Sequence, residues 1–174
     1  MITNPVHKRN NMLIILRGNA CSGKSTIAEH LRSHFKDAQT AIIRTEIFYW
    51  EIVRGDCPHV AMENTRRILD TYLKNGYHVV LEGTLAKRDE KGQLYIKRFL
   101  RTAKKHGVQA HVFFLEAQFS ELKRREKTRK KISLKRLKEL YDETNEARIP
   151  QEIVIDTSDL SINRVLAQIR THIG

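Results

Sequence analysis

The chain has 174 residues, enough for one compact domain with a sizeable core and too few for two comfortable ones. Hydrophobic residues make up 40% and charged residues 30%, which is ordinary for a globular protein. No stretch of 18 apolar residues occurs, and the polar first eleven residues lack the apolar core of a secretion signal. Two cysteines are too few for a disulfide scaffold. We therefore expect a single cytoplasmic domain over residues 1–174, without membrane contact and with a loose tail over residues 1–11.

The net charge of +12 is concentrated in one part of the chain. Residues 87–138 contain 18 Lys and Arg but only 5 Asp and Glu, a balance of +13, and the rest of the chain sums to −1. A concentrated positive field favours an anionic partner. That partner is either a nucleotide or a polynucleotide.

The predicted elements alternate between strands and helices. Residues 12–17 form a short apolar run that ends in glycine, which is typical of a buried strand. Residues 25–35 follow with apolar side chains at helical spacing. Next in chain order we expect strand 41–43, helices 46–53 and 60–73, strand 77–81, helix 94–105, strand 110–115, helices 119–129 and 134–143, strand 153–155 and a closing amphipathic helix at 162–169.

This alternation predicts an α/β fold of three layers, with a five-stranded parallel sheet flanked by helices. In open parallel sheets, ligands bind beyond the carboxyl ends of the strands. The residues that follow the five predicted strands are therefore the first candidates for a functional site.

The stretch GNACSGKST, residues 18–26, matches the phosphate-binding pattern G-x-x-x-x-G-K-[ST]. The glycines allow a loop to wrap closely around a phosphate, and the following helix adds the positive end of its dipole. In this pattern Lys24 contacts the β- and γ-phosphates and the Ser25 hydroxyl contacts Mg²⁺. The alternative is a purely structural role, in which a glycine turn caps a helix and binds no phosphate. The predicted nucleotide-binding residues of the loop are Gly18, Asn19, Ala20, Cys21, Ser22, Gly23, Lys24, Ser25 and Thr26.

Cys21 lies inside this loop and leaves two interpretations open. Amides at a helix start can lower the pKa of a thiol and make it oxidisable. A small residue that fills space in the loop is the more ordinary interpretation.

Five segments in order, GNACSGKST, IIRTEIF, VVLEGTL, LKRREKTRKK and IVIDTSD, resemble the small P-loop kinases. That group includes zeta-toxin-like, gluconate, shikimate and antibiotic phosphotransferases, and the resemblance covers nearly the whole chain. It implies a P-loop NTPase fold with a basic helical lid at roughly 118–138, the cofactors ATP and Mg²⁺, and transfer of the γ-phosphoryl group to an acceptor hydroxyl. A switch GTPase would need an N-K-x-D motif, which is absent, and a large AAA+ ATPase would need more chain.

Two carboxylates follow predicted strands. Glu46 stands where the related kinases usually have an Asp that accepts the proton of the substrate hydroxyl. A carboxylate at a helix start is also favoured by the helix dipole, so a capping role stays open. Glu82 ends an apolar strand, where an unpaired acid would be costly, and we expect it near Mg²⁺ or the substrate. Which of the two is the base stays open.

The basic segment LKRREKTRKK corresponds to the lid of the resembling kinases. Arg125 and Arg129 are four residues apart, so a helix places them on one face. By resemblance, Arg125 lies over the adenine or near the phosphates, and Arg129 points at the transferred phosphoryl group. Asp156 and Thr157, which follow the last predicted strand, resemble the segment that contacts the adenine in these kinases. The alternative is a solvated basic helix.

We expect the acceptor pocket to be built from Arg44, residues 46–58 and the loop 83–92. The aromatic residues Phe48, Tyr49 and Trp50 would either stack a flat acceptor or belong to the core.

A second class of function stays open. The protein would then be an ATP-binding protein that interacts with nucleic acid, or a polynucleotide 5′-hydroxyl kinase, through residues 87–138. A degenerate kinase that binds ATP without turnover is a third possibility. The expected partners are thus a nucleoside triphosphate, a small-molecule acceptor and, in the alternative, a nucleic acid.

Overall fold

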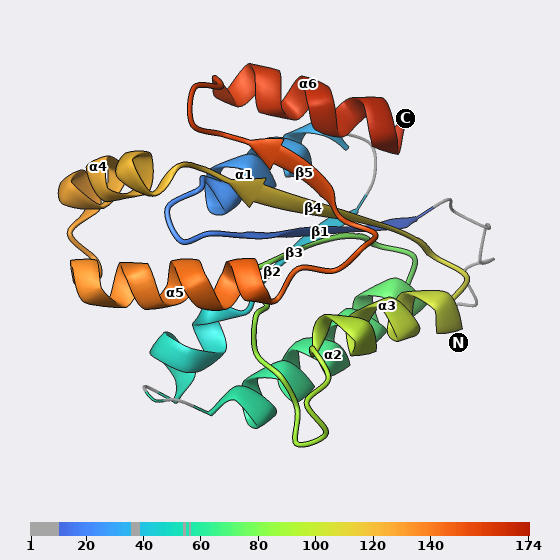
Figure 1. The fold of residues 1–174 in the computed structure, drawn as a ribbon. Helices are drawn as coiled ribbons and strands as arrows, with labels where there is room; N and C mark the ends of the chain where they lie inside the picture. The colour runs from blue at the N-terminus through green and yellow to red at the C-terminus, as the bar shows by residue number, and fades with distance from the viewer. Residues whose placement is uncertain (1–10, 36–38, 54, 56) are drawn as a thin grey trace, which may run out of the picture.

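A five-stranded parallel sheet forms the centre of the molecule in the computed structural model, which describes residues 11–35, 39–53, 55 and 57–174 (Figure 1). The predicted α/β class with a parallel sheet is therefore confirmed. Residues 1–10 of the expected tail at 1–11 lie outside the described residues, whereas Asn11 is held in place because its Nδ2 donates to the carbonyl oxygens of Leu73 and Tyr77 at 3.3 and 3.2 Å. The strand order is β2-β3-β1-β4-β5. The strands are β1 (Met12–Gly18), β2 (Thr40–Arg44), β3 (His78–Glu82), β4 (Gln109–Glu116) and β5 (Ile153–Asp156).

Helices cover both faces of the sheet. In Figure 1, α1 and α6 lie above the sheet, α2 and α3 lie below it, and the α4–α5 pair stands at the end where the strands finish. No helix within the described ranges is long and apolar enough to cross a membrane. The helices are α1 (Lys24–His34), η1 (Phe48–Ile52), α2 (Pro58–Lys74), α3 (Ile96–Lys105), α4 (Phe119–Arg129), α5 (Leu134–Glu146) and α6 (Ile162–Ile173).

The predicted helix at 46–53 is the element that differs most in type, because the structure has a five-residue π-helix, η1, at its centre. A π-helix is rare in proteins, and the instances that occur are often found at functional sites. Helix α2 begins at Pro58, where proline has no amide hydrogen to leave unpaired. The other predicted elements agree with the observed ones to within a few residues.

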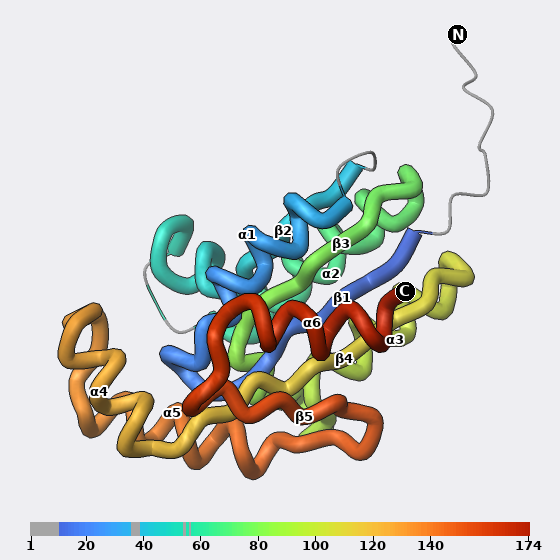
Figure 2. The backbone as a smooth tube through the Cα atoms, turned by 90° about the horizontal axis from the view of Figure 1, so that it is seen from above, coloured from blue at the N-terminus to red at the C-terminus, as the bar shows by residue number. Residues whose placement is uncertain are grey.

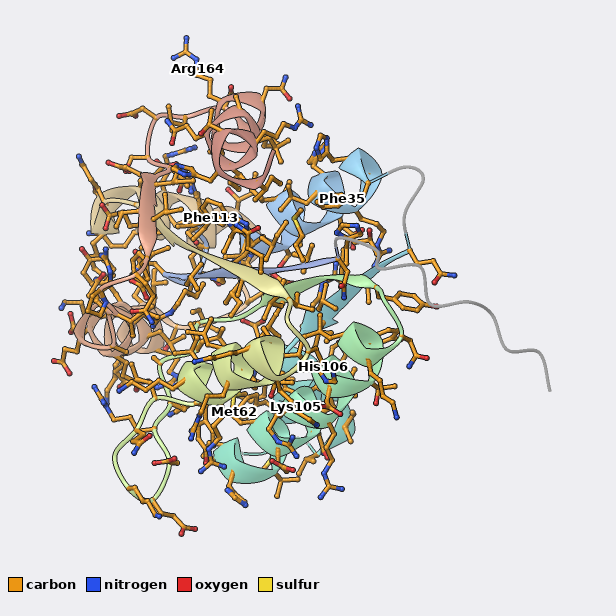
Figure 3. The ribbon with its side chains drawn as sticks, turned by 90° about the vertical axis from the view of Figure 1, so that its right-hand side faces the viewer. Phe35, Met62, Lys105, His106, Phe113 and Arg164 are labelled. Carbon is orange, nitrogen blue, oxygen red and sulfur yellow. The ribbon has the colours of Figure 1, made fainter. Side chains whose placement is uncertain are left out.

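Alternate residues of β1 belong to two hydrophobic cores. Leu13 and Ile15 pack with residues of α2 and α3, whereas Ile14 and Leu16 pack with residues of α1 and α6. In Figure 3, Phe113 lies on the α6 side of the sheet and Met62 on the opposite side, as their two clusters require. A parallel sheet buried on both faces explains why this strand is apolar throughout.

The strand register brings the predicted site residues to one edge of the sheet. Glu82 of β3 lies opposite Leu16 of β1 and opposite Arg44 of β2. On the other side of β1, Gly18 lies opposite Leu115 of β4. Figure 2 shows the strands fanning side by side beneath α1 and α6. The loop after β1 is therefore flanked by the ends of β3 and β4.

A buried ion pair lies directly before this loop. Arg17 is fully buried and pairs with Glu152, whose side chain is also buried. Arg17 also donates to the carbonyl oxygen of Ala147 at 2.8 Å, and Arg148 donates to the second Glu152 oxygen at 2.7 Å. Burial lowers the pKa of Arg17, while Glu152 opposes that effect. These contacts fix the chain between α5 and β5 under the end of β1.

We predict that Glu152→Ala lowers the free energy of unfolding by about 3 to 5 kcal/mol, because it leaves the buried Arg17 charge uncompensated. Chemical denaturation measures this value. The matched control Glu139→Ala removes an exposed carboxylate that pairs with Arg136, and should change stability by about 0.5 kcal/mol or less. Equal effects of the two substitutions would contradict the assignment of Glu152.

Candidate functional site

The loop between β1 and α1 needs both of its glycines. Gly18 has a φ of +135°, and a Cβ atom there would lie 2.0 Å from the carbonyl oxygen of Leu115. Gly23 has a φ of +92° and open space where a side chain would stand. Gly18 thus permits close packing on β4, and Gly23 supplies a left-handed backbone at the start of α1.

Three polar side chains of the loop are buried, and not all of their hydrogen-bonding groups have partners among the described residues. Lys24 is 7% exposed, and its Nζ donates to the carbonyl oxygens of Asn19 and Gly18 at 2.7 and 3.2 Å. Among the described residues, Ser22 Oγ and Asn19 Nδ2 are buried without a hydrogen-bond partner. Burial lowers the pKa of Lys24, and the negative charges of Glu46 and Glu82 oppose that effect. Unpaired buried donors in the same loop as a buried ammonium group fit a loop that receives an anion.

The predicted metal residues lie together. Burial raises the pKa of Glu82, and a hydrogen bond with Ser25 and the charges of Lys24 and Arg44 oppose that effect. Arg44 Nε donates to Glu82 Oε1 at 2.8 Å. No group of three or more potential metal-ligating side chains occurs in the described part of the chain. One hydroxyl and one carboxylate suit Mg²⁺, which keeps several waters and takes its other ligands from phosphates.

Glu46 lies just beyond β2 and is exposed. Its charge acts on both Lys24 and Glu82, so it stands at the same edge of the sheet. Thr26 is exposed in the first turn of α1.

The structure contradicts one of the two interpretations of Cys21, that of a thiol with a lowered pKa. Burial raises the pKa of its thiol, and a hydrogen bond to Glu126 raises it further, so the thiol is not activated by the helix start. Its φ of +66° is unusual for a residue other than glycine. Ala20 and Cys21 pack into a small apolar cluster with Leu122 and Leu137 of the α4–α5 pair. Cys21 is therefore a contact between the loop and these helices.

Arg125 uses all of its donors within the protein. Its Nε donates to Glu121 at 2.7 Å, and its Nη atoms reach the Cys21 carbonyl, the Thr157 side chain and carbonyl, and the Ser158 carbonyl at 2.5 to 3.4 Å. The one hydroxyl hydrogen of Thr157 in turn faces two carbonyl oxygens, that of Glu116 at 2.9 Å from Oγ1 and that of Ser22 at 3.3 Å. The two predicted adenine-side residues, Arg125 and Thr157, therefore lie side by side against the loop.

Arg129 has a looser position. Its Nη1 donates to Cys21 Sγ at 3.1 Å, and sulfur is a weak acceptor. Together with Arg125, it brings the same face of α4 against the loop, as the four-residue spacing predicts.

The expected acceptor region shows a mixture of core and surface. Phe48 is buried and Tyr49 packs against the core, whereas Trp50 is 65% exposed. A groove of about 260 Å³ lies between α5 and residues 86–88, where Lys87 approaches Glu143 at 3.7 Å. Arg54 and Asp56, part of the expected 46–58 segment, lie outside the described residues.

The basic residues of 87–138 do not form one continuous surface along which a polynucleotide could bind. They are divided between the loop 83–92, α3 and the α4–α5 pair, and α3 and the α4–α5 pair lie at opposite ends of the molecule in Figure 1. Several already pair with carboxylates, as Arg98 does with Asp89 and Lys105 with Asp70. This distribution does not favour the nucleic-acid alternative.

Comparison with known proteins identifies the family. Residues 13–148 match the AAA_33 family, described as an AAA domain, and the chain belongs to that family. The match covers the loop, four of the five strands and the α4–α5 pair. No curated protein matches the chain.

Solved structures share the fold. The tunicamycin resistance protein of Deinococcus radiodurans is 18% identical with a TM-score of 0.67, covering 94% of this chain and 96% of that one. A gluconokinase from Sinorhizobium meliloti 1021 is 15% identical with a TM-score of 0.64, covering 95% and 97%. The Mycobacterium tuberculosis APS kinase CysC, in complex with AMPPNP and APS, is 13% identical with a TM-score of 0.64, covering 94% and 97%. Family and fold thus confirm the resemblance to the small P-loop kinases.

We predict that the ion pairs of Glu121 make stability depend on acid pH. Hydrogen bonds from Arg124 and Arg125 lower the pKa of Glu121 to about 2 from its ordinary 4.5. The folded pKa is the lower one, so this contribution is complete above about 4.5 and is lost as the pH falls towards 2. The unfolding temperature of Glu121→Gln should therefore fall less steeply over this range than that of the natural chain. Parallel curves would contradict the prediction.

Proposed function

We propose that the protein is an ATP-dependent phosphotransferase that moves the γ-phosphoryl group of ATP–Mg²⁺ to the hydroxyl of a small-molecule acceptor. The observation that carries the proposal is the loop 18–26, which contains a buried ammonium group and two buried polar atoms, Ser22 Oγ and Asn19 Nδ2, without a hydrogen-bond partner among the described residues. The family and the kinases that share the fold support the same class.

The residues of the loop bind the triphosphate in this proposal. Lys24 exchanges the carbonyl oxygens of Gly18 and Asn19 for β- and γ-phosphate oxygens, since an anion satisfies its charge better than neutral carbonyls do. The Ser25 hydroxyl and the Glu82 carboxylate would hold Mg²⁺. When bound, the metal compensates the charge of the phosphates.

The two arginines of α4 take different roles. Arg125 holds its guanidinium plane against Thr157 through contacts that occupy all its donors, and supports the adenine with its face. Within the described part of the chain, Arg129 has only the sulfur of Cys21 to release, and it turns to the γ-phosphoryl group, where it stabilises the charge of the transition state. The α4–α5 pair, seated against the loop as a lid, would exclude water from the transfer.

Glu46 orients the acceptor hydroxyl and receives its proton. It is exposed at the end of β2, whereas Glu82 is buried and engaged with Ser25 and Arg44. We therefore assign the base to Glu46. The acceptor would lie among η1, the loop 83–92 and α5.

We predict that Lys24→Ala abolishes phosphotransfer and leaves the fold intact. A screen of the purified protein with labelled ATP should include small alcohols, sugars, nucleosides, aminoglycoside and phenicol antibiotics, and 5′-hydroxyl oligonucleotides. Circular dichroism serves as the control for folding. Unchanged turnover in the variant would refute the role of the loop, and labelling of the oligonucleotides alone would favour the polynucleotide kinase.

We predict that Glu46→Gln lowers kcat by about 100-fold or more, because general-base catalysis contributes on that scale. Nucleotide affinity should stay the same, since Glu46 binds no phosphate in this proposal. Calorimetry with AMP-PNP measures the affinity, and a rate assay with the acceptor found in the screen measures kcat. A variant with normal kcat would assign the base elsewhere.

A further inference from the structure

Glu126 is a buried carboxylate that the proposed chemistry leaves without a role. It is 3% exposed, although it lies on a helix whose exposed face is strongly basic. Burial opposes the charge of Glu126, but hydrogen bonds from the Ile132 amide, the Cys21 thiol and the Lys131 amide lower its pKa overall. Nothing in the sequence singles out Glu126, because it is one of many charged residues in LKRREKTRKK.

The two oxygens of Glu126 bind two different parts of the molecule. Oε1 accepts from the backbone amides of Lys131 and Ile132, the latter at 2.7 Å, and so closes the turn between α4 and α5. That turn needs support, because Lys130 has a left-handed φ of +51°. Oε2 accepts from the thiol of Cys21 at 3.1 Å and so reaches the phosphate loop. One carboxylate therefore joins the turn of the helical pair to the loop.

Arg129 contacts the same sulfur atom as Glu126. Its Nη1 donates to Cys21 Sγ at 3.1 Å, and it follows Glu126 by three residues on the same face of α4. The thiol of Cys21 thus donates to the Glu126 carboxylate, and its sulfur accepts weakly from the Arg129 guanidinium.

We propose that Glu126 is a positioning residue that acts through Cys21 to keep Arg129 within reach of the γ-phosphoryl group; this inference rests on the proposed function. When a triphosphate enters the loop, Arg129 leaves the weak sulfur acceptor for phosphate oxygens, with which guanidinium groups form strong paired hydrogen bonds. Glu126 stays on the Cys21 thiol and on the turn, so α4 does not drift from the loop while Arg129 turns.

The test is the preference for AMP-PNP over ADP in the presence of Mg²⁺, measured by calorimetry, because only AMP-PNP carries a third phosphoryl group. Glu126→Ala should reduce this preference about tenfold, as Arg129→Ala does, which is the scale of one hydrogen bond between charged groups. The double variant should lose no more than Arg129→Ala alone. The matched control Arg124→Ala removes an exposed arginine of the same helix and should keep the natural preference.

Two further variants separate positioning from folding. Glu126→Gln keeps an oxygen for the turn amides and an amide that can donate to the sulfur, and should retain most of the preference. Cys21→Ala breaks the same link from the loop side and leaves the closed turn in place, so it should lose the preference even if Glu126→Ala does not fold.

The outcomes distinguish the two proposals. If the natural chain binds neither nucleotide, the proposed function fails and this inference fails with it. If it binds both equally, the proposed function stands and the positioning role is overturned, because no contact with the third phosphoryl group then exists for Glu126 to support. If the natural chain prefers AMP-PNP but Glu126→Ala and Cys21→Ala weaken both nucleotides equally, the proposed function stands and the positioning role is overturned. An effect of Glu126→Ala that persists beside Arg129→Ala would also overturn it.

Discussion

The buried ammonium group of Lys24 is the constraint on which the functional end of the molecule depends. A charge removed from water is costly unless other groups compensate it. Here two carbonyl oxygens of the loop and the charges of Glu46 and Glu82 do so incompletely, because the pKa of Lys24 stays lowered. The loop can hold this lysine in place because Gly18 packs directly on β4, where a side chain would collide with Leu115. The fold thus maintains a cation that an anionic ligand would satisfy.

The α4–α5 pair meets the loop through contacts of very different strength. Arg125 is held by several acceptors and Glu126 by three donors, whereas Arg129 donates to one sulfur atom among the residues that the structure describes. The apolar cluster around Cys21 excludes water from the base of these contacts. A helix that is firmly seated at its base, with one loosely held arginine, suits a site in which that arginine changes partners during the reaction cycle.

The sequence predicts the fold well because its signals are local. The apolar run of β1, the glycines of the loop and the alternation of strands with helices each follow from backbone sterics and burial. The residues of the loop, together with Glu82, Arg125 and Thr157, are brought together as expected. The identity of the base, the cytoplasmic location and the extent of the lid stay predictions.

Contacts between distant segments are what the sequence does not reveal. Arg17 and Glu152 are far apart in the chain, and nothing in either segment marks them as partners. Glu126 is hidden among neighbouring charges, and its burial depends on how α4 is seated on the loop. For Cys21 the sequence leaves an activated thiol and a space-filling residue open. Only the tertiary packing, which raises the pKa of the thiol, decides for the space-filling residue.

A crystal structure of the protein with AMP-PNP and Mg²⁺ tests the central claim most directly. We predict that the triphosphate lies along residues 18–26 and that Lys24 Nζ has left the carbonyl oxygens of Gly18 and Asn19 for the phosphates. A loop that stays empty at saturating nucleotide, with Lys24 still bound to those two carbonyls, would contradict the account.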